Sequence, residues 1–256
     1  RNYHSTLSFI KQCDIVFHLA ADVGGRGYLE GKNVWSNVEL DATVFRACKD
    51  IEKLVYFSSA LVYPPSGTFS ETQFCDISLA DGSYGKGKLI GEMMLKDFSF
   101  DSVSIRPFTV YGERMKENRS IGALIAKTFI KQDPFEVWGD GNQVVDYVYV
   151  KDVVNAAVFA SGLGDSLNVG SGFGETPMTA LEIIWSYAGW KPKDIVFRKD
   201  KPISQKRISI NSRLSELGWQ PNYTFKSGIE RTMDWYFKTH SVNDVRKNLE
   251  ERLVTI

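Results

Sequence analysis

The sequence predicts an α/β fold of the doubly wound kind, a parallel sheet with helices on both faces. Three observations predict it. Short apolar runs alternate with longer segments whose apolar residues recur at helical spacing. The apolar runs are continuous rather than alternating, as in strands buried on both faces. Each strand-like run leads into a helix-like segment, as in parallel crossover connections.

The first part of the chain repeats this strand–helix order. Residues 13–21 form an apolar run that reads as a buried strand, and glycines 24, 25, 27 and 31 mark residues 22–31 as a loop. Pro64 and Pro65 end the second unit, because proline cannot sit in a central strand. We expect further strands at 53–59, 102–107 and 143–150 and helices at 33–49, 83–98, 122–131 and 151–161.

The last part of the chain has a different pattern and reads as a smaller lobe. We expect helices at 179–188, 214–217 and 224–239, a short strand at 194–198, and a charged peripheral segment from 241 onward. The sequence thus predicts a larger domain at 1–115 and 142–172 and a smaller α/β lobe at 116–141 and 173–256.

Composition excludes several classes of protein. Lysine plus arginine equals aspartate plus glutamate at 31 each, which argues against a nucleic-acid or anionic-membrane surface. Three cysteines and three histidines are widely spaced, so neither a disulfide framework nor a metal site is expected. No run approaches the ~20 apolar residues of a membrane span, and no signal peptide is visible. We therefore expect a protein of the reducing cytoplasm.

Tyr84 and Lys88 lie four residues apart on a predicted helix, so their side chains share one face. A tyrosine phenol has a pKa near ~10, too high for a base at neutral pH. An ammonium at ~4 Å stabilises the phenolate by roughly 4 kcal/mol, or about three pKa units as a generous limit. That shift suits proton transfer. By itself the pair is equally compatible with a helix surface.

Ser58 and Ser59 end the second predicted strand. Ligands of open parallel sheets bind beyond the carboxyl ends of the strands, so a serine hydroxyl there can bond a substrate oxygen. A serine pair at this point is also a common way to begin a turn.

The combination of motifs is more specific than any one of them. They occupy residues 18–21, 57–64, 84–88 with Gly91 and Glu92, 106–112 and 139–143, and continue at 168–172 and 217–221. In this order and spacing they resemble the extended short-chain dehydrogenase/reductase family, the NAD-dependent nucleotide-sugar epimerases and dehydratases. The resemblance covers nearly the whole chain.

The resemblance implies roles for particular residues. Ser59, Tyr84 and Lys88 would be the catalytic trio, and NAD or NADP the cofactor. The residues expected to bind the cofactor are Leu19, Ala20, Ala21, Ser58, Tyr84, Lys88, Pro107 and Phe108. The larger domain would be the NAD-binding Rossmann domain and the smaller lobe would bind substrate. Since no glycine precedes Asp14, the glycine-rich turn that opens such a domain is apparently missing from the N-terminal part.

The substrate side most resembles the GDP-mannose 3,5-epimerases, through the loop at 20–28. There Gly24 and Gly25 would lie against the hexose, and Ser59 and Thr109 would also contact substrate. Lys116 loosely matches a lysine of those enzymes. Arg207 matches a phosphate-binding arginine of the family, and an arginine fork suits phosphate. Both could equally be solvated loop residues.

Three departures narrow the chemistry. Leu61 stands where the 3,5-epimerases and GDP-fucose synthases carry cysteine, and the 4,6-dehydratases carry Asp-Glu at Ala60 and Leu61. Val145 replaces a usual arginine, and Thr109 a usual asparagine. Alanine and leucine cannot transfer a proton, so dehydration and double epimerisation are disfavoured. Oxidation and re-reduction at one carbon remain.

The sequence therefore predicts an NAD(P)-dependent epimerase of a nucleotide-diphosphate sugar, acting at one carbon, C4. A keto reductase like GDP-fucose synthase, a 3,5-epimerase, and a non-catalytic nucleotide-sugar-binding relative stay open as alternatives. The resemblance also implies a homodimer, paired through the helices at 33–49 and 83–98.

Overall fold

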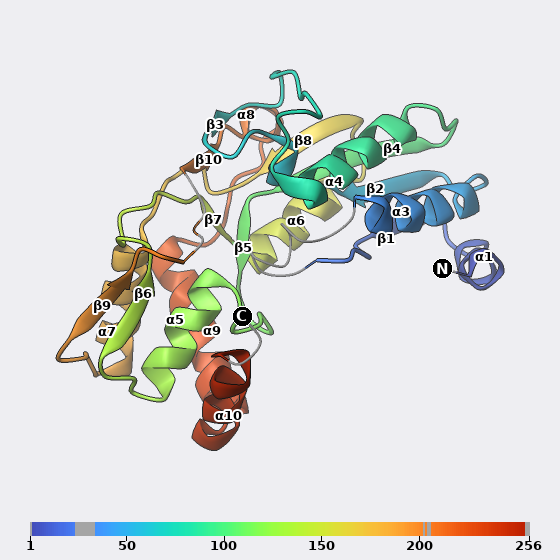
Figure 1. Cartoon of the computed structure of the whole chain (residues 1–256). Coiled ribbons are helices and arrows are strands. Elements are labelled where there is room, and N and C mark those ends of the chain that lie inside the picture. The colour runs from blue at the N-terminus through green and yellow to red at the C-terminus, as the bar shows by residue number, and fades with distance from the viewer. Residues whose placement is uncertain (1, 24–33, 202, 204–205, 254–256) are drawn as a thin grey trace.

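The computed structural model describes residues 2–23, 34–201, 203 and 206–253. Its centre is a four-stranded sheet in the order β1-β2-β4-β8, in which all neighbouring strands are parallel (Figure 1). The strands are β1 Ile15–His18, β2 Lys53–Phe57, β4 Asp101–Pro107 and β8 Asp165–Val169. The predicted parallel α/β architecture is confirmed.

Helices pack against both faces of this sheet. The flanking helices are α3 Trp35–Ala47, α4 Gly82–Leu95 and α6 Val150–Ala160. Side chains of successive strand residues point to opposite faces. Accordingly, Leu54 and Tyr56 of β2 join a core cluster with Phe45 of α3, whereas Val55 joins the cluster that contains Val153 of α6. Burial on both faces explains why residues 54–57 of β2 are all apolar.

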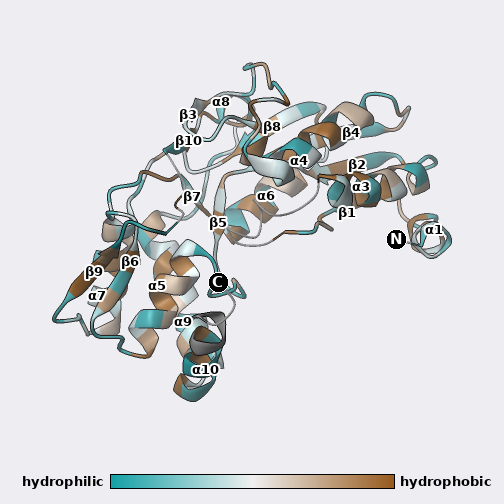
Figure 2. Cartoon of the chain, in the orientation of Figure 1, coloured by the Kyte–Doolittle hydropathy of each residue, from teal (hydrophilic) through white to brown (hydrophobic). Residues whose placement is uncertain are grey.

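A second group of elements has a hydrophobic core of its own. It comprises α5 Ser120–Phe129, α7 Pro177–Ala188, α9 Phe225–Thr239, α10 Val242–Leu253 and the parallel pair β6 Phe135–Trp138 and β9 Ile195–Arg198. Figure 1 shows this group beside the four-stranded sheet and its helices. In Figure 2 brown, hydrophobic residues concentrate in helices and strands of both groups.

The remaining elements described in the structure are short. They are α1 Tyr3–Ile10, the 3-10 helix η1 Ala60–Val62, the parallel pairs β3 Gly67–Phe69 with β10 Arg207–Ser209 and β5 Thr109–Tyr111 with β7 Tyr147–Tyr149, and α8 Ser212–Glu216. Leu214 and Trp219 pack into the same cluster as β4 and β8. The segment around α8 therefore lies against the main sheet, although it comes late in the chain.

Several elements differ from the sequence-based expectation. β8 was not predicted, and the strand expected at 143–150 is the shorter β7, which pairs with β5 outside the main sheet. The segment after residue 241 was expected to be peripheral, but Val245 of α10 is fully buried in the second core.

In α3 the buried face carries Asn37, Asp41 and Phe45, while the apolar Val38 is only half-buried. Polar side chains point inward in α3 because each has a bonding partner there. Asn37 bonds the backbone of Asp22. Asp41 bonds the buried His18 and Tyr56. In the described parts of the chain, no helix is long and apolar enough to cross a membrane.

Candidate active site

Ser59 lies just beyond the carboxyl end of β2. The backbone N–H of Ser58 donates to the carbonyls of Tyr56 and Ile105, which turns the chain out of the sheet. Ser59 then caps η1, and its Oγ accepts a hydrogen bond from the backbone N–H of Leu61 at 3.2 Å. The serine hydroxyl is thus presented at the sheet edge where ligands of parallel sheets bind.

The loop that carries Ser59 rests on the first turns of α4. The backbone N–H of Asp81 donates to the carbonyls of Leu61 at 2.9 Å and Tyr63 at 3.2 Å. A Cβ on Gly85 would lie 2.0 Å from the Leu61 carbonyl oxygen, so only glycine permits this contact. Because Tyr84 precedes Gly85, the structure brings the Ser59 loop and Tyr84 together.

Lys88 follows Tyr84 by one turn and is completely buried. Its Nζ has no hydrogen-bond partner among the described residues. It lies 3.8 Å from Asp41 Oδ1 and 4.6 Å from the centre of the Tyr56 ring. A buried ammonium with unused donors is costly unless a ligand accepts them. The ribose hydroxyls of a nicotinamide nucleotide fit this donor.

The charge balance around Tyr84 differs from the sequence-based expectation. Burial, followed by the negative charge of Asp41, raises the pKa of Tyr84 to about 12, and the positive charge of Arg119 opposes this. Burial likewise lowers the pKa of Lys88, against the charges of Asp41 and Glu92. Lys88 alone therefore does not bring the pKa of the phenol into the neutral range, because burial and then the charge of Asp41 act against it.

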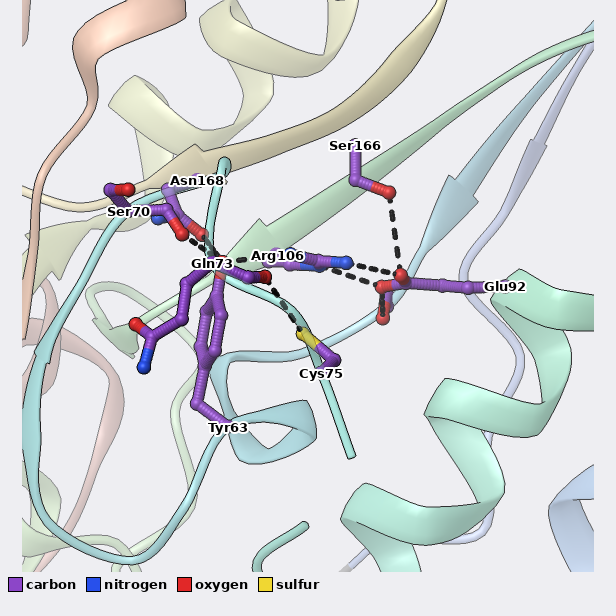
Figure 3. A network of polar contacts seen from close by, with 9 residues as sticks. Tyr63, Ser70, Gln73, Cys75, Glu92, Arg106, Ser166 and Asn168 are labelled. Atoms are coloured by element: carbon purple, nitrogen blue, oxygen red, sulfur yellow. Dashed lines mark hydrogen bonds and ion pairs between the residues drawn. The ribbon is translucent and has the colours of Figure 1, made fainter. Parts of the chain in front are cut away.

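A network of buried polar side chains lies between α4 and the main sheet (Figure 3). Glu92 accepts hydrogen bonds from the Ser58 hydroxyl and from Arg106, whose Nε and Nη2 lie 2.9 and 2.5 Å from the carboxylate. Arg106 Nη1 donates to the Tyr63 hydroxyl, which donates to Asn168 Oδ1. The network links α4 to β2, β4 and β8. In the structure the Ser58 hydroxyl serves this network.

The remaining cofactor residues predicted from the sequence follow the ends of β1 and β4. Leu19 and Ala20 are exposed and Ala21 is half-buried directly after β1. Pro107 ends β4 and is half-buried, and Phe108 beyond it is buried. The strand ends carrying these residues and Ser59 lie at the same edge of the sheet, since all the strands are parallel.

The predicted substrate residues are more scattered. Gly24 and Gly25 lie outside the described residues. Thr109 is half-buried at the start of β5, and Lys116 is exposed. Arg207 is buried, and its guanidinium donates to the carbonyls of Ala60 and Pro65 and forms an ion pair with Asp81.

Two of those contacts bind Arg207 to Ala60 and Pro65, which follow Ser59 in the chain. Binding of a phosphate by Arg207 therefore stays a prediction, one that requires these donors to be shared or rearranged.

Two charged residues near Tyr84 were not foreseen. Asp41 is fully buried, and Arg119 precedes α5 and acts electrostatically on Tyr84. The polar pair Asn37 and Asp41, four apart and followed four residues later by Phe45, is the pattern that could have revealed an inward polar face. Arg119 carried no comparable signal. Among the described residues, no group of three or more His, Cys, Asp or Glu side chains could hold a metal ion.

Comparison with known proteins agrees with this arrangement. The profile of the NAD dependent epimerase/dehydratase family matches residues 1–170. A UDP-glucose 4-epimerase of Mycolicibacterium smegmatis is 30% identical over 87% of this chain and 76% of its own. A probable GDP-L-fucose synthase of Oryza sativa subsp. japonica is 25% identical over 91% and 82%.

A solved structure has the same fold. It is that of UDP-glucuronic acid 4-epimerase from Bacillus cereus in complex with UDP-glucuronic acid and NAD, with a TM-score of 0.82, 24% identity, and coverage of 94% of this chain and 81% of that one. The motifs, the parallel sheet and the family match agree. The chain belongs to the NAD dependent epimerase/dehydratase family.

Proposed function

We propose that this protein is an NAD(P)-dependent nucleotide-sugar epimerase that withdraws hydride from one sugar carbon, C4, and returns it to the opposite face. The observation that carries the proposal is the buried, hydrogen-bond-deficient ammonium of Lys88 one turn after Tyr84, beside the Ser59 loop. In this loop Ala60 and Leu61 offer no further acid or base. A single proton-handling group suits chemistry at a single carbon.

Each member of the trio has a distinct task in this proposal. Ser59 Oγ orients the reacting sugar oxygen. Tyr84 exchanges a proton with that oxygen, as acid when the hydroxyl re-forms and as base when the carbonyl forms. Lys88 holds the ribose and favours the phenolate. The bound cofactor supplies the hydride acceptor, with Leu19, Ala20, Ala21, Ser58, Pro107 and Phe108 as its further contacts.

The pKa of Tyr84 is raised to about 12, so Tyr84 is protonated at neutral pH and must lose its proton before it can act as a base. A protonated phenol is ready to donate to a carbonyl oxygen, which suits the return half of the reaction. In the forward half the cationic side chains Lys88 and Arg119 stabilise the phenolate. Oxidised nicotinamide adds positive charge when bound.

The division of labour between the two groups of elements is also proposed. Residues 1–115 and 142–172 would bind the cofactor, and residues 116–141 and 173–256 the nucleotide sugar, with Gly24, Gly25, Thr109, Lys116 and Arg207 as further substrate contacts. A homodimer through α3 and α4 is proposed on the same family resemblance. Gel filtration with light scattering tests it.

The experiment is direct. The protein and NAD are incubated with one nucleotide sugar at a time: UDP-glucose, UDP-glucuronate or GDP-mannose. The anomeric and H4 proton signals are followed by NMR. Interconversion of C4 epimers with NAD conserved is the expected result. No NAD binding and no conversion of any of these substrates would contradict the proposal.

A one-way keto reductase is the second candidate, favoured by the similarity to a probable GDP-L-fucose synthase over 91% of the chain. A reductase consumes one reduced nicotinamide per turnover, whereas an epimerase consumes none. Absorbance at the reduced-nicotinamide band during turnover therefore separates the two.

A further inference from the structure

A cluster of four buried side chains lies behind the candidate active site. This Asp41 cluster comprises His18, Asp41, Tyr56 and Lys88, with exposed fractions of 3%, 0%, 0% and 0%. The four residues come from β1, α3, β2 and α4 respectively. Such a concentration of polar groups in a core is costly unless each is paired.

Asp41 is the centre of the cluster. Its Oδ2 accepts a hydrogen bond from the Tyr56 hydroxyl at 2.6 Å. Its Oδ1 lies 2.7 Å from His18 Nε2, which donates because a carboxylate only accepts. The same Oδ1 lies 3.8 Å from Lys88 Nζ. Two hydrogen bonds from opposite sides fix the carboxylate, so its position beside Lys88 is built into the fold.

Tyr56 serves Lys88 in a second way. Its ring lies 4.6 Å from Lys88 Nζ, at cation–π distance, while its hydroxyl is bonded to Asp41. This arrangement requires Gly91 on α4, because a Cβ there would lie 2.2 Å from the Tyr56 hydroxyl and 3.0 Å from Asp41 Oδ2. The helix that carries Lys88 can therefore approach the cluster only at a glycine.

The other charged groups near Lys88 are already engaged. Glu92, one turn further along α4, forms a buried ion pair with Arg106. Tyr84 and Tyr56 are phenols whose pKa values burial raises, so both are neutral at physiological pH. His18 is bonded to Asp41. Asp41 is thus the only ion-pair partner recorded for the Lys88 ammonium within the described residues.

We propose that Asp41 is a positioning residue that keeps Lys88 charged and aimed at the cofactor ribose. In this proposal it acts through Lys88 rather than on the cofactor or the reacting atoms. The structural part of this inference stands on the geometry of the cluster, whereas its catalytic consequence rests on the proposed epimerase function.

The first test measures Lys88 itself. Protein labelled with ¹³C at the lysine ε-carbon is titrated by NMR, and the Lys88 signal is assigned by its loss in Lys88→Arg. In Asp41→Asn the pKa of Lys88 is expected to fall by about one to three units, the usual effect of losing an opposite charge at this distance.

Asp50→Asn is the matched control, because it removes the same charge from a side chain that is 74% exposed. It should leave the pKa of Lys88 unchanged. An equal pKa of Lys88 in wild type and Asp41→Asn would overturn the proposal. If Asp41→Asn does not fold, the wild type decides: a Lys88 that is ammonium at pH 7 supports the proposal, and a neutral amine contradicts it.

The second test measures catalysis. Asp41→Asn is expected to lower kcat for epimerisation by roughly tenfold, with little change in the KM for the nucleotide sugar. The alkaline limb of its pH–rate profile should move to lower pH, because Lys88 loses its proton more readily without the charge of Asp41. A purely structural role would lower activity without moving this limb.

The two tests fail separately. A wild-type protein without epimerase activity would refute the proposed function, while the Lys88 titration would still decide the role of Asp41. An active wild type whose kcat and pH profile are unaffected by Asp41→Asn would refute the catalytic role of Asp41 alone.

Discussion

At the scale of single residues, the buried charges of Lys88 and Asp41 determine the electrostatics of the site. Lys88 and Asp41 form an ion pair inside the core, and removing one partner of such a pair leaves an uncompensated charge. Neutral phenols surround the pair and cannot replace either partner. Burial leaves the Lys88 ammonium without a hydrogen-bond partner among the described residues, and burial also raises the pKa of Tyr84 and keeps it protonated.

Because buried phenols have raised pKa values, we expect the free energy of unfolding to fall at alkaline pH. Burial raises the pKa of Tyr63 to about 12, above its unfolded value of about 10. Its contribution is therefore complete below pH ~10 and is lost as the pH rises toward 12, because the unfolded chain releases the proton first. The expected slope is about 1.4 kcal/mol per pH unit for each such group.

Urea denaturation between pH 8 and 11.5 measures this effect. Tyr63→Phe should be less stable than wild type at pH 8, since it loses hydrogen bonds to Asn168 and Arg106, but should lose less stability as the pH rises. Parallel pH dependences for the two proteins would show that Tyr63 does not titrate abnormally.

At the scale of elements, catalytic geometry depends on how closely η1 approaches α4. Gly85 is the contact point, 2.0 Å from the Leu61 carbonyl oxygen by the position its Cβ would take. Arg207 links Ala60 of the same loop to Asp81, the N-cap residue of α4. Ser59 and Tyr84 are therefore held together by backbone contacts rather than by a bond between them.

Gly85→Ala should displace the Ser59 loop from Tyr84. We expect kcat to fall by about 10²-fold, the cost of a displacement near 1 Å in a catalytic constellation. Gly162→Ala is the control, since nothing lies within 4 Å of a Cβ there. Steady-state kinetics of both variants is the measurement, and equal kcat values would argue against the contact being functional.

At the scale of the whole molecule, short strand pairs join the core clusters of the main sheet to the core of the second group of elements. Part of this was predictable: apolar runs predicted β1, β2 and β4 and the motifs predicted the trio, whereas β8 was not predicted. The polar inward face of α3 was not predicted either, because the hydrogen-bond partners that Asn37 and Asp41 find in the interior are distant in sequence. The contacts of Arg207 with Ala60 and Asp81 are equally non-local.

The C-terminal helix α10 is part of the second core. Val245 is fully buried there, whereas Val242 on the same helix is 38% exposed. Val245→Ala should cost roughly 1.5–3 kcal/mol of the free energy of unfolding, and Val242→Ala under 1 kcal/mol. Chemical denaturation compares the two, and equal losses would show that α10 is peripheral after all.

The central claim is that Tyr84 handles the proton of the reacting sugar hydroxyl. Removing only its hydroxyl, in Tyr84→Phe, tests this claim most directly when epimerisation is followed by NMR. The matched control is Tyr187→Phe, whose hydroxyl is bonded to Asp234 far from the site, in the second group of elements. We predict a fall in kcat of about 10²–10⁴-fold for Tyr84→Phe, with the melting temperature unchanged and Tyr187→Phe fully active. Full activity in Tyr84→Phe would contradict the account.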